Sequence, residues 1–178
     1  MKKVLFVIPA VFSLIVTYAQ NGGADKAYFH NGKTYEVKIV RVNEFTIIYK
    51  FIGEDAEQTI GKYAVKKSVY NSGREEEISE KVIVTGKDDW ENVVLIEDKS
   101  AAAGLSKKEE IRGKTAVFYS FHTANSADKK AIKKIKQEAA ELGAQFVLLT
   151  AEGDAKGNQG IGLGTAQGIK RGLAYAYQ

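Results

Sequence analysis

The sequence predicts an α+β protein built from two domains. The first is a small all-β domain of the barrel or SH3-like roll type, and the second is a β-α-β-β domain with one helix packed on a small sheet. Short apolar runs separated by Gly, Asn and Asp turns fill residues 31–79, which is typical of small β-domains. Apolar residues at helical spacing then lie between β-rich runs in residues 108–178, which indicates the mixed second domain.

Residues 1–19 have the pattern of a cleavable signal peptide. Two lysines begin the segment, an apolar run covers residues 4–16, and Ala19 supplies a small residue at the cleavage position. The run is shorter than the ~20 apolar residues that a membrane-spanning helix needs, which makes a retained anchor the weaker alternative. We therefore expect a periplasmic or secreted mature chain that begins at Gln20, with a flexible N-terminal segment over 20–30.

The β-domain, residues 31–79, is expected to hold five short strands. Tyr35, Val37 and Ile39 alternate with polar residues after an Asn-Gly turn, as in a half-buried strand that could extend to Arg41. A run rich in β-branched and aromatic residues follows and should form a hairpin with it. The later elements are this second strand at 45–52, shorter strands at 58–60, 65–70 and 74–78, and turns at 62–64 and 71–73.

Residues 80–107 are expected to connect the two domains. Two short apolar runs, 81–84 and 93–96, could be strands on either side of a turn at 88–92. The only tryptophan, Trp90, lies in this turn. Because a large aromatic ring in a small domain usually packs against a core, we expect Trp90 to be partly buried.

The C-terminal domain, residues 108–178, begins with a strand expected over 110–121. A helix should follow, with Asn125 or Ser126 as its N-terminal cap and Gly143 in the left-handed conformation at its end. A buried strand at 145–150 and a final strand at 169–177 complete the domain. The helix residues expected against the sheet are Ile132, Ile135, Ala139 and Leu142.

Two parts of the chain resemble known groups of proteins. The runs GKTYEVKIVRVNEFTIIYKF and VKKSVYNSGREE, within residues 31–78, resemble a strand-turn pattern of exported Bacteroidota proteins, which implies a β fold and export. The run KKAIKKIKQEAAELGAQFVLLT, with RGLAYAY near the end, resembles the YbjQ-like and RcsF-like families of small bacterial α+β domains. The YbjQ-like resemblance implies a heavy-metal-binding module, and the RcsF-like resemblance implies an envelope stress sensor that uses disulfides.

Composition disfavours several functional classes. The formal net charge is +4, and removal of Lys2 and Lys3 with the signal would lower it by two, which is too little to argue for nucleic acid. Without any cysteine, the chain can form neither a disulfide nor a thiolate metal site. The two histidines, His30 and His122, lie far apart in sequence, so we expect each at a surface or strand end and not as a metal ligand. We expect no metal and no cofactor.

Two further segments suggest catalysis or phosphate binding only by their composition. Ser120, His122 and Asp128 are neighbours in sequence, but no Gly-x-Ser-x-Gly elbow precedes them. The glycine-rich run Gly153–Thr165 has no Lys-Ser/Thr after its last glycine and no helix pattern at its third. We expect this run to be a flexible hairpin connection.

The polar face of the predicted helix supplies the candidate interaction residues, which are Lys129, Lys130, Lys133 and Lys134. Cations near a helix start oppose the helix dipole by roughly 0.3–1 kcal/mol each. An anionic partner would offset that cost, and an ordinary solvated face is the alternative.

The sequence therefore predicts a non-catalytic exported binding or interaction protein of the cell envelope. Its partner would be an unknown protein or an anionic envelope component, and not nucleic acid or a membrane span. A periplasmic hydrolase that uses the His122 region and a metal-binding module remain the alternatives, the latter implied only by family resemblance.

Overall fold

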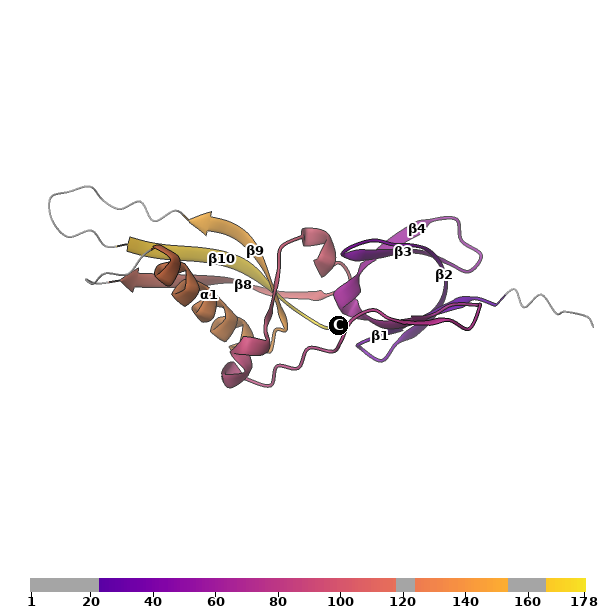
Figure 1. The fold of residues 1–178 in the computed structure, drawn as a ribbon, viewed down its shortest axis with the longest axis horizontal. Coiled ribbons are helices and arrows are strands. Elements are labelled where there is room, and N and C mark those ends of the chain that lie inside the picture. Colours follow the sequence, from indigo (N-terminus) through magenta and orange to yellow (C-terminus); the bar gives the residue numbers. More distant parts are fainter. Residues whose placement is uncertain (1–22, 118–123, 154–165) are drawn as a thin grey trace, which may run out of the picture.

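The computed structural model describes residues 23–117, 124–153 and 166–178, which form two β-sheets and one α-helix (Figure 1). The protein therefore belongs to the α+β class, with more strand than helix, as predicted. The proposed signal peptide, Ser120, His122 and residues 154–165 of the glycine-rich run lie outside the described residues.

Sheet A contains six antiparallel strands in the order β4-β3-β2-β1-β5-β6. Its strands are β1 (Asp25–Phe29), β2 (Thr34–Val42), β3 (Thr46–Phe51), β4 (Glu57–Gly61), β5 (Val65–Val69) and β6 (Glu75–Glu77). The 3-10 helix η1 (Lys62–Ala64) replaces the irregular turn that was predicted at the same residues. Strands β2 to β6 confirm the five predicted strands.

Strand β1 is an addition, because its residues were expected in a flexible N-terminal segment. It pairs with β2 on one side and with β5 on the other, so it lies inside the sheet. Asp25 fixes its beginning, since its two carboxylate oxygens accept hydrogen bonds from the main-chain nitrogens of Ile39 and Asn71, at 2.8 and 2.9 Å. Ordering of residues 25–29 thus comes from two neighbouring strands and not from a local pattern.

Sheet A does not close into a barrel, although it curves strongly (Figure 1). Strands β4 and β6 are its two edges, and β6 pairs with β5 over only three residue pairs before the chain leaves the sheet. Of the two expected architectures, a barrel or an SH3-like roll, the barrel is therefore not closed, because the last strand is too short to form a second ladder.

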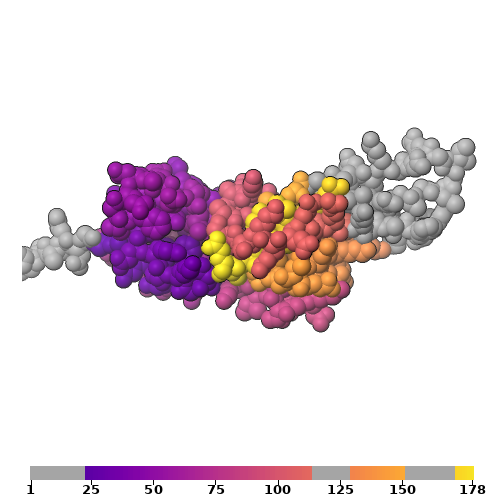
Figure 2. Space-filling model, turned by 180° about the vertical axis from the view of Figure 1, so that it is seen from behind, coloured from indigo at the N-terminus to yellow at the C-terminus, as the bar shows by residue number. Residues whose placement is uncertain are grey.

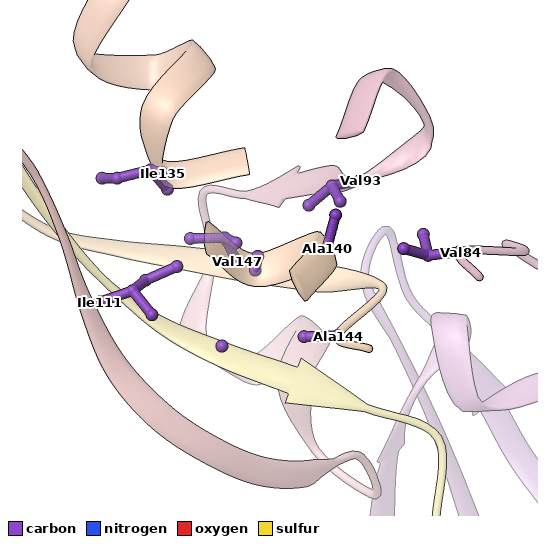
Figure 3. Close-up of a cluster of buried hydrophobic side chains, with 9 residues drawn as sticks. Val84, Val93, Ile111, Ile135, Ala140, Ala144 and Val147 are labelled. Carbon is purple, nitrogen blue, oxygen red and sulfur yellow. The ribbon is translucent and has the colours of Figure 1, made fainter. Parts of the chain in front are cut away.

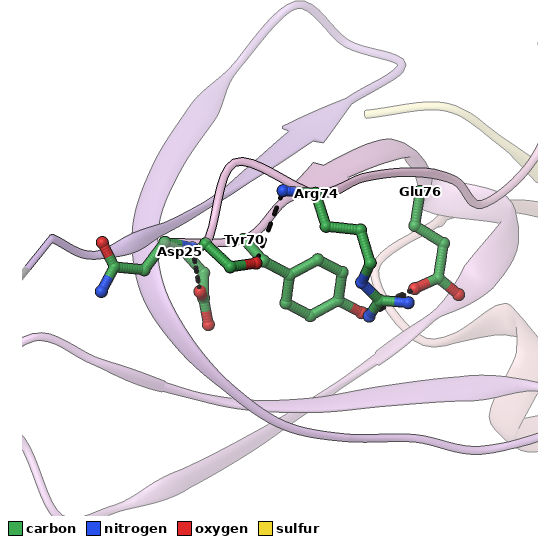
Figure 4. A network of polar contacts seen from close by, with 6 residues as sticks. Asp25, Tyr70, Arg74 and Glu76 are labelled. Carbon is green, nitrogen blue, oxygen red and sulfur yellow. Dashed lines mark hydrogen bonds and ion pairs between the residues drawn. The ribbon is translucent and has the colours of Figure 1, made fainter.

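The β5–β6 hairpin is held by a polar cluster at its turn (Figure 4). The guanidinium of Arg74 lies 4.0 Å from the ring centroid of Tyr70 and forms an ion pair with Glu76 at 3.3 Å. The Tyr70 hydroxyl donates to the same carboxylate at 2.7 Å. Because Arg74 and Glu76 pair with each other and with Tyr70, we interpret this cluster as stabilising the hairpin and not as a ligand site.

Sheet B has the strand order β7-β9-β10-β8. Its strands are β7 (Val94–Ile96), β8 (Ser106–Val117), β9 (Phe146–Gly153) and β10 (Ala166–Ala176). The helix α1 (Ala124–Glu141) lies between β8 and β9 in the sequence. The predicted order β-α-β-β is confirmed by β8, α1, β9 and β10. Strand β7 confirms the strand suggested at 93–96 and is the fourth strand of the sheet, parallel to β9.

The segment before β7 differs from the prediction. Residues 81–84 form no strand, because their main-chain groups bond to side chains: Val82 N donates to the Tyr177 hydroxyl at 3.0 Å, and the Asn92 amide donates to Ile83 O at 3.2 Å. The predicted turn at 88–92 is the 3-10 helix η2 (Lys87–Asn92). A third such helix, η3 (Lys99–Ala102), follows β7.

Helix α1 covers one face of sheet B and encloses the first core cluster (Figures 1 and 3). Ile135 and Ala139 are fully buried there, as predicted, and Trp90 packs partly buried against the cluster. The prediction was wrong for Leu142, which is 38% exposed because it follows the last helical residue. Small residues bring the helix close: a Cβ on Gly113 of β8 would lie 2.4 Å from the carbonyl oxygen of Ala131.

The two ends of α1 test the capping predictions. Gly143 has φ +65°, its nitrogen donates to Ala140 O at 3.0 Å, and Ala144 N donates to Ala139 O at 2.9 Å. This is the Schellman arrangement of a helix that ends before a left-handed residue, as expected. The helix begins at Ala124, so Asn125 and Ser126 lie inside it and the predicted N-terminal cap is wrong.

Candidate ligand site at the junction of the two sheets

The two sheets meet through a second apolar cluster. Phe146 of β9 is fully buried, and its ring centroid lies 5.1 Å from that of Tyr63 in η1. The Gly61 nitrogen, at the end of β4, donates to Ala103 O at 2.9 Å, so main chain from both sides is joined directly. In Figure 2 the yellow C-terminal residues lie at the boundary between the indigo and purple N-terminal part and the remainder of the chain.

A cavity of about 220 Å³ opens beside this junction. It is bounded by the strongly curved sheet A on one side and by the C-terminal end of the chain on the other. Its lining residues are Phe29, Asn31, Tyr35, Tyr49, Phe51, Ile60, Ala64, Gly104, Tyr177 and Gln178.

Strand register explains why aromatic side chains gather in this cavity. Val37 pairs with Phe51 and Ile39 pairs with Tyr49 across β2 and β3. Because side chains alternate between the two faces of a strand, Tyr35 lies on the same face as these four residues. The predicted alternation of β2 is confirmed up to Ile39, after which a register shift interrupts it before Arg41.

Four of the rings hold one another in place. Phe29 meets Tyr35, Tyr35 meets Phe51, and Phe51 meets Tyr49, with centroid separations of 5.2, 6.0 and 5.5 Å and interplanar angles of 84°, 74° and 87°. Edge-to-face contacts of this kind contribute about 0.5–1.5 kcal/mol each beyond the burial of apolar area. The aromatic wall is therefore positioned by its own contacts, without a ligand.

Two of the residues in the wall, Tyr35 and Tyr49, carry a phenol hydroxyl. Burial raises the pKa of Tyr49, and the neighbouring Tyr35 raises it further. Tyr49 is therefore a neutral phenol at physiological pH. Within the described part of the chain, the hydroxyls of Tyr35 and Tyr49 form no hydrogen bond, so both are available to a bound molecule.

The opposite wall is supplied by residues near the C-terminal end of the chain. Tyr177 is held in place because its hydroxyl accepts from Val82 N and its nitrogen donates to Gln145 Oε1 at 3.3 Å. Its ring centroid lies 5.3 Å from that of Phe146. Gln178 lines the cavity together with Tyr177.

A histidine and a serine form a hydrogen bond close to this site. His30 Nε2 lies 2.9 Å from Ser79 Oγ, which itself lies 2.9 Å from Val65 O and 3.1 Å from Lys62 O. Carbonyl oxygens only accept, so the serine proton is directed at one of them and the imidazole N–H donates to the serine. A nucleophilic serine needs the reverse arrangement, in which the imidazole accepts the serine proton. The pair therefore fastens the end of β1 to the segment that follows β6.

Burial also lowers the pKa of His30, which is only 8% exposed. The residue is at a strand end, as expected, but the strand end is buried and not at the surface.

The predicted interaction lysines do not line the cavity. Lys129, Lys130, Lys133 and Lys134 are all exposed on α1. The Lys133 ammonium lies 4.7 Å from the centroid of the Trp90 ring, and the nearby Lys136 donates to Glu91 O at 3.3 Å. Part of the lysine face therefore attaches η2 to the helix.

The described residues do not support the alternative catalytic, phosphate-binding or metal sites. Ser120 and His122 lie outside the described residues, as does the glycine-rich run after Gly153; Asp128 belongs to α1, but its side chain is not described. Among the described side chains, no group of three or more His, Asp or Glu residues could hold a metal ion. In the same part of the chain, no helix is long and apolar enough to span a membrane.

Comparison with protein-family models, with curated proteins and with solved structures finds no match to this chain in any of the three.

Sequence reasoning did not find the cavity, although part of its signal was present. Three of the five inward positions on β2 and β3 carry aromatic residues, namely Tyr35, Tyr49 and Phe51, whereas Val37 and Ile39 are aliphatic. Large rings on the concave side of a small sheet indicate that aromatic side chains, and not the usual aliphatic ones, form this face. The contribution of Tyr177 could not be seen, because it depends on how the two sheets meet.

Proposed function

We propose that this protein is a non-catalytic, exported binding protein whose ligand site is the aromatic cavity at the junction of the two sheets. One observation carries the proposal: self-supporting aromatic rings and unpaired phenol groups line a cavity that is open to solvent. Small-molecule sites combine mainly apolar or aromatic walls with a few placed polar groups, and this cavity has that composition.

The size of the cavity favours a small ligand. A volume of about 220 Å³ equals the share of roughly seven water molecules at ~30 Å³ each. It lies just below the usual range of ligand pockets, ~300–1,000 Å³, so we expect a molecule of one ring and not a large cofactor.

Nuclear magnetic resonance of the full chain, labelled with ¹³C in its aromatic rings, tests the proposal. We expect uncharged one-ring fragments to shift the resonances of Tyr49 and Phe51. Tyr28 and Tyr70 serve as internal controls, because neither lines the cavity. The proposal fails if no fragment shifts the cavity rings, or if Tyr28 and Tyr70 shift equally.

Export is proposed on the sequence pattern of residues 1–19 and has its own test. Mass spectrometry of the protein purified from its native cells should find a mature chain that begins at Gln20. An intact Met1 in a membrane fraction would contradict it. The proposed compartment is the periplasm or the exterior, in line with an envelope protein without cysteine.

We also propose that sheet A is an open roll of the SH3-like type, which the strand order β4-β3-β2-β1-β5-β6 and its curvature support. An open roll leaves the concave face accessible at one end. The cavity lies on that face, so this architecture agrees with a binding function.

A further inference from the structure

We infer that the cavity takes a neutral ring that carries several hydroxyl groups, namely a single sugar unit. This inference rests on the proposed function, since it names the chemical class of ligand for the same site. A free monosaccharide and the terminal unit of a glycan share this chemistry.

The first feature is the charge of the lining side chains. None of the residues that line the cavity is Asp, Glu, Lys or Arg. A charged ligand would lose hydration on entry and would meet no side chain of opposite charge, which is costly in a partly enclosed site. Burial holds Tyr49 in its neutral form, so this phenol does not supply a charge either. The ligand is therefore neutral.

The second feature is the supply of polar groups. Tyr35 and Tyr49 line the cavity, and the hydroxyl of each forms no hydrogen bond within the described residues. Asn31 uses its carbonyl oxygen to accept from Lys33 N at 3.0 Å, which leaves its amide nitrogen for a ligand. A purely apolar ligand would cover these groups without pairing them, at a cost of about 1–3 kcal/mol for each buried group. The ligand must therefore offer several hydrogen-bonding partners.

The third feature is the combination of groups in the wall. Four mutually supported rings line the cavity together with residues that carry phenol and amide groups. A sugar ring matches both features, because its C–H groups pack on aromatic carbon and its hydroxyls both donate and accept. Hydroxyls can therefore pair with a phenol or an amide in either role.

Binding to the full chain should be measured by calorimetry and by the aromatic resonances of Tyr49. The neutral probes are methyl β-D-glucopyranoside, methyl β-D-galactopyranoside and cellotriose. The charged probes are glucuronic acid and glucosamine, which keep the ring and add one charge of either sign. Phenol and cyclohexanol are the apolar probes, because they fit the volume but carry a single hydroxyl.

We expect at least one neutral glycoside to bind at least tenfold more tightly than its charged analogues and than phenol. Tighter binding of cellotriose would assign the site to a glycan end, and equal binding would assign it to a free sugar. Tyr49→Phe should weaken glycoside binding at least fivefold, since it removes one hydroxyl and keeps the ring. Tyr28→Phe is the matched control and should bind as the wild type does, and both variants should melt at the wild-type temperature.

The outcomes separate this inference from the proposed function. If phenol or cyclohexanol binds at the cavity more tightly than every glycoside, the sugar assignment is overturned and the binding function stands. If a charged sugar binds best, the argument from charge is wrong. If none of the probes shifts the Tyr49 resonances, both the sugar assignment and the cavity as a small-molecule site are overturned.

Discussion

The imidazole of His30 donates to the hydroxyl of Ser79 at 2.9 Å, and this hydrogen bond joins the end of β1 to a residue 49 positions later in the chain. The Ser79 hydroxyl in turn donates a hydrogen bond to a main-chain carbonyl of the η1–β5 region. The bond therefore ties three segments together beside the cavity. It also makes the protonation state of one histidine part of the folding equilibrium.

The first prediction concerns acid stability. Burial lowers the pKa of His30 below 6.5 in the folded state, so the unfolded chain takes up a proton first as the pH falls. The stabilisation is fully present above pH ~6.5 and is lost as the pH falls toward the folded pKa. Urea unfolding between pH 7.5 and 5.5 should show a falling free energy of unfolding. His30→Gln keeps an N–H donor and removes the titrating imidazole, so it should reduce this slope. Equal slopes for His30→Gln and the wild type would contradict the prediction.

The second prediction concerns the packed face of α1. Ile135 is 0% exposed in the first core cluster, so Ile135→Ala should lower the free energy of unfolding by ~2–5 kcal/mol through lost burial and a cavity. Ile83 is 63% exposed, and Ile83→Ala should change stability by less than about 0.5 kcal/mol. Chemical denaturation of the two variants makes the comparison. Similar losses at both positions would show that α1 does not pack as described.

The third prediction concerns the close contact between β4 of sheet A and the helix η3. A Cβ on Gly61 would lie 2.2 Å from the carbonyl oxygen of Ala101, and this atom cannot yield as a side chain can. Gly61→Ala should therefore destabilise the chain by at least ~1–3 kcal/mol. Gly86 is the control, because a Cβ there meets nothing within 4 Å and its φ of 175° suits any residue. A thermal melt in which both variants unfold at the same temperature would refute the packing argument.

The fourth prediction concerns the lysine face. Lys133 lies over the ring of Trp90, so Lys133→Gln should cost about 0.5–1 kcal/mol and change the fluorescence of the only tryptophan. Lys130→Gln should leave both quantities unchanged, because Lys130 is exposed and does not contact Trp90. If both variants gave the wild-type spectrum and stability, the Lys133–Trp90 contact would not be stabilising in solution.

Local sequence patterns predicted the structure correctly wherever a residue's conformation depends on its near neighbours. The alternation of Tyr35, Val37 and Ile39 predicted β2, since two-residue periodicity is a property of any half-buried strand. Ile135, Ala139 and Gly143 predicted the packed face and the end of α1 for the same kind of reason. The prediction for Leu142 was wrong, because helical periodicity does not show at which residue the helix ends.

Other features depended on partners far away in the sequence. Residues 25–29 carry no clear strand pattern and become β1 because β2 and β5 pair with it on both sides. Residues 81–84 look like a strand but are not one, since Tyr177 and Asn92 take their main-chain bonds.

The sequence by itself thus determined the class of fold, most of the strands, the single α-helix among the described residues and the absence of cysteine chemistry. Only the tertiary structure decided where a ligand could bind. Phe29 and Tyr177 line the same cavity although almost the whole described chain separates them. Strand and helix periodicities act over a few residues, whereas a cavity forms where surfaces from distant segments meet without filling the space between them.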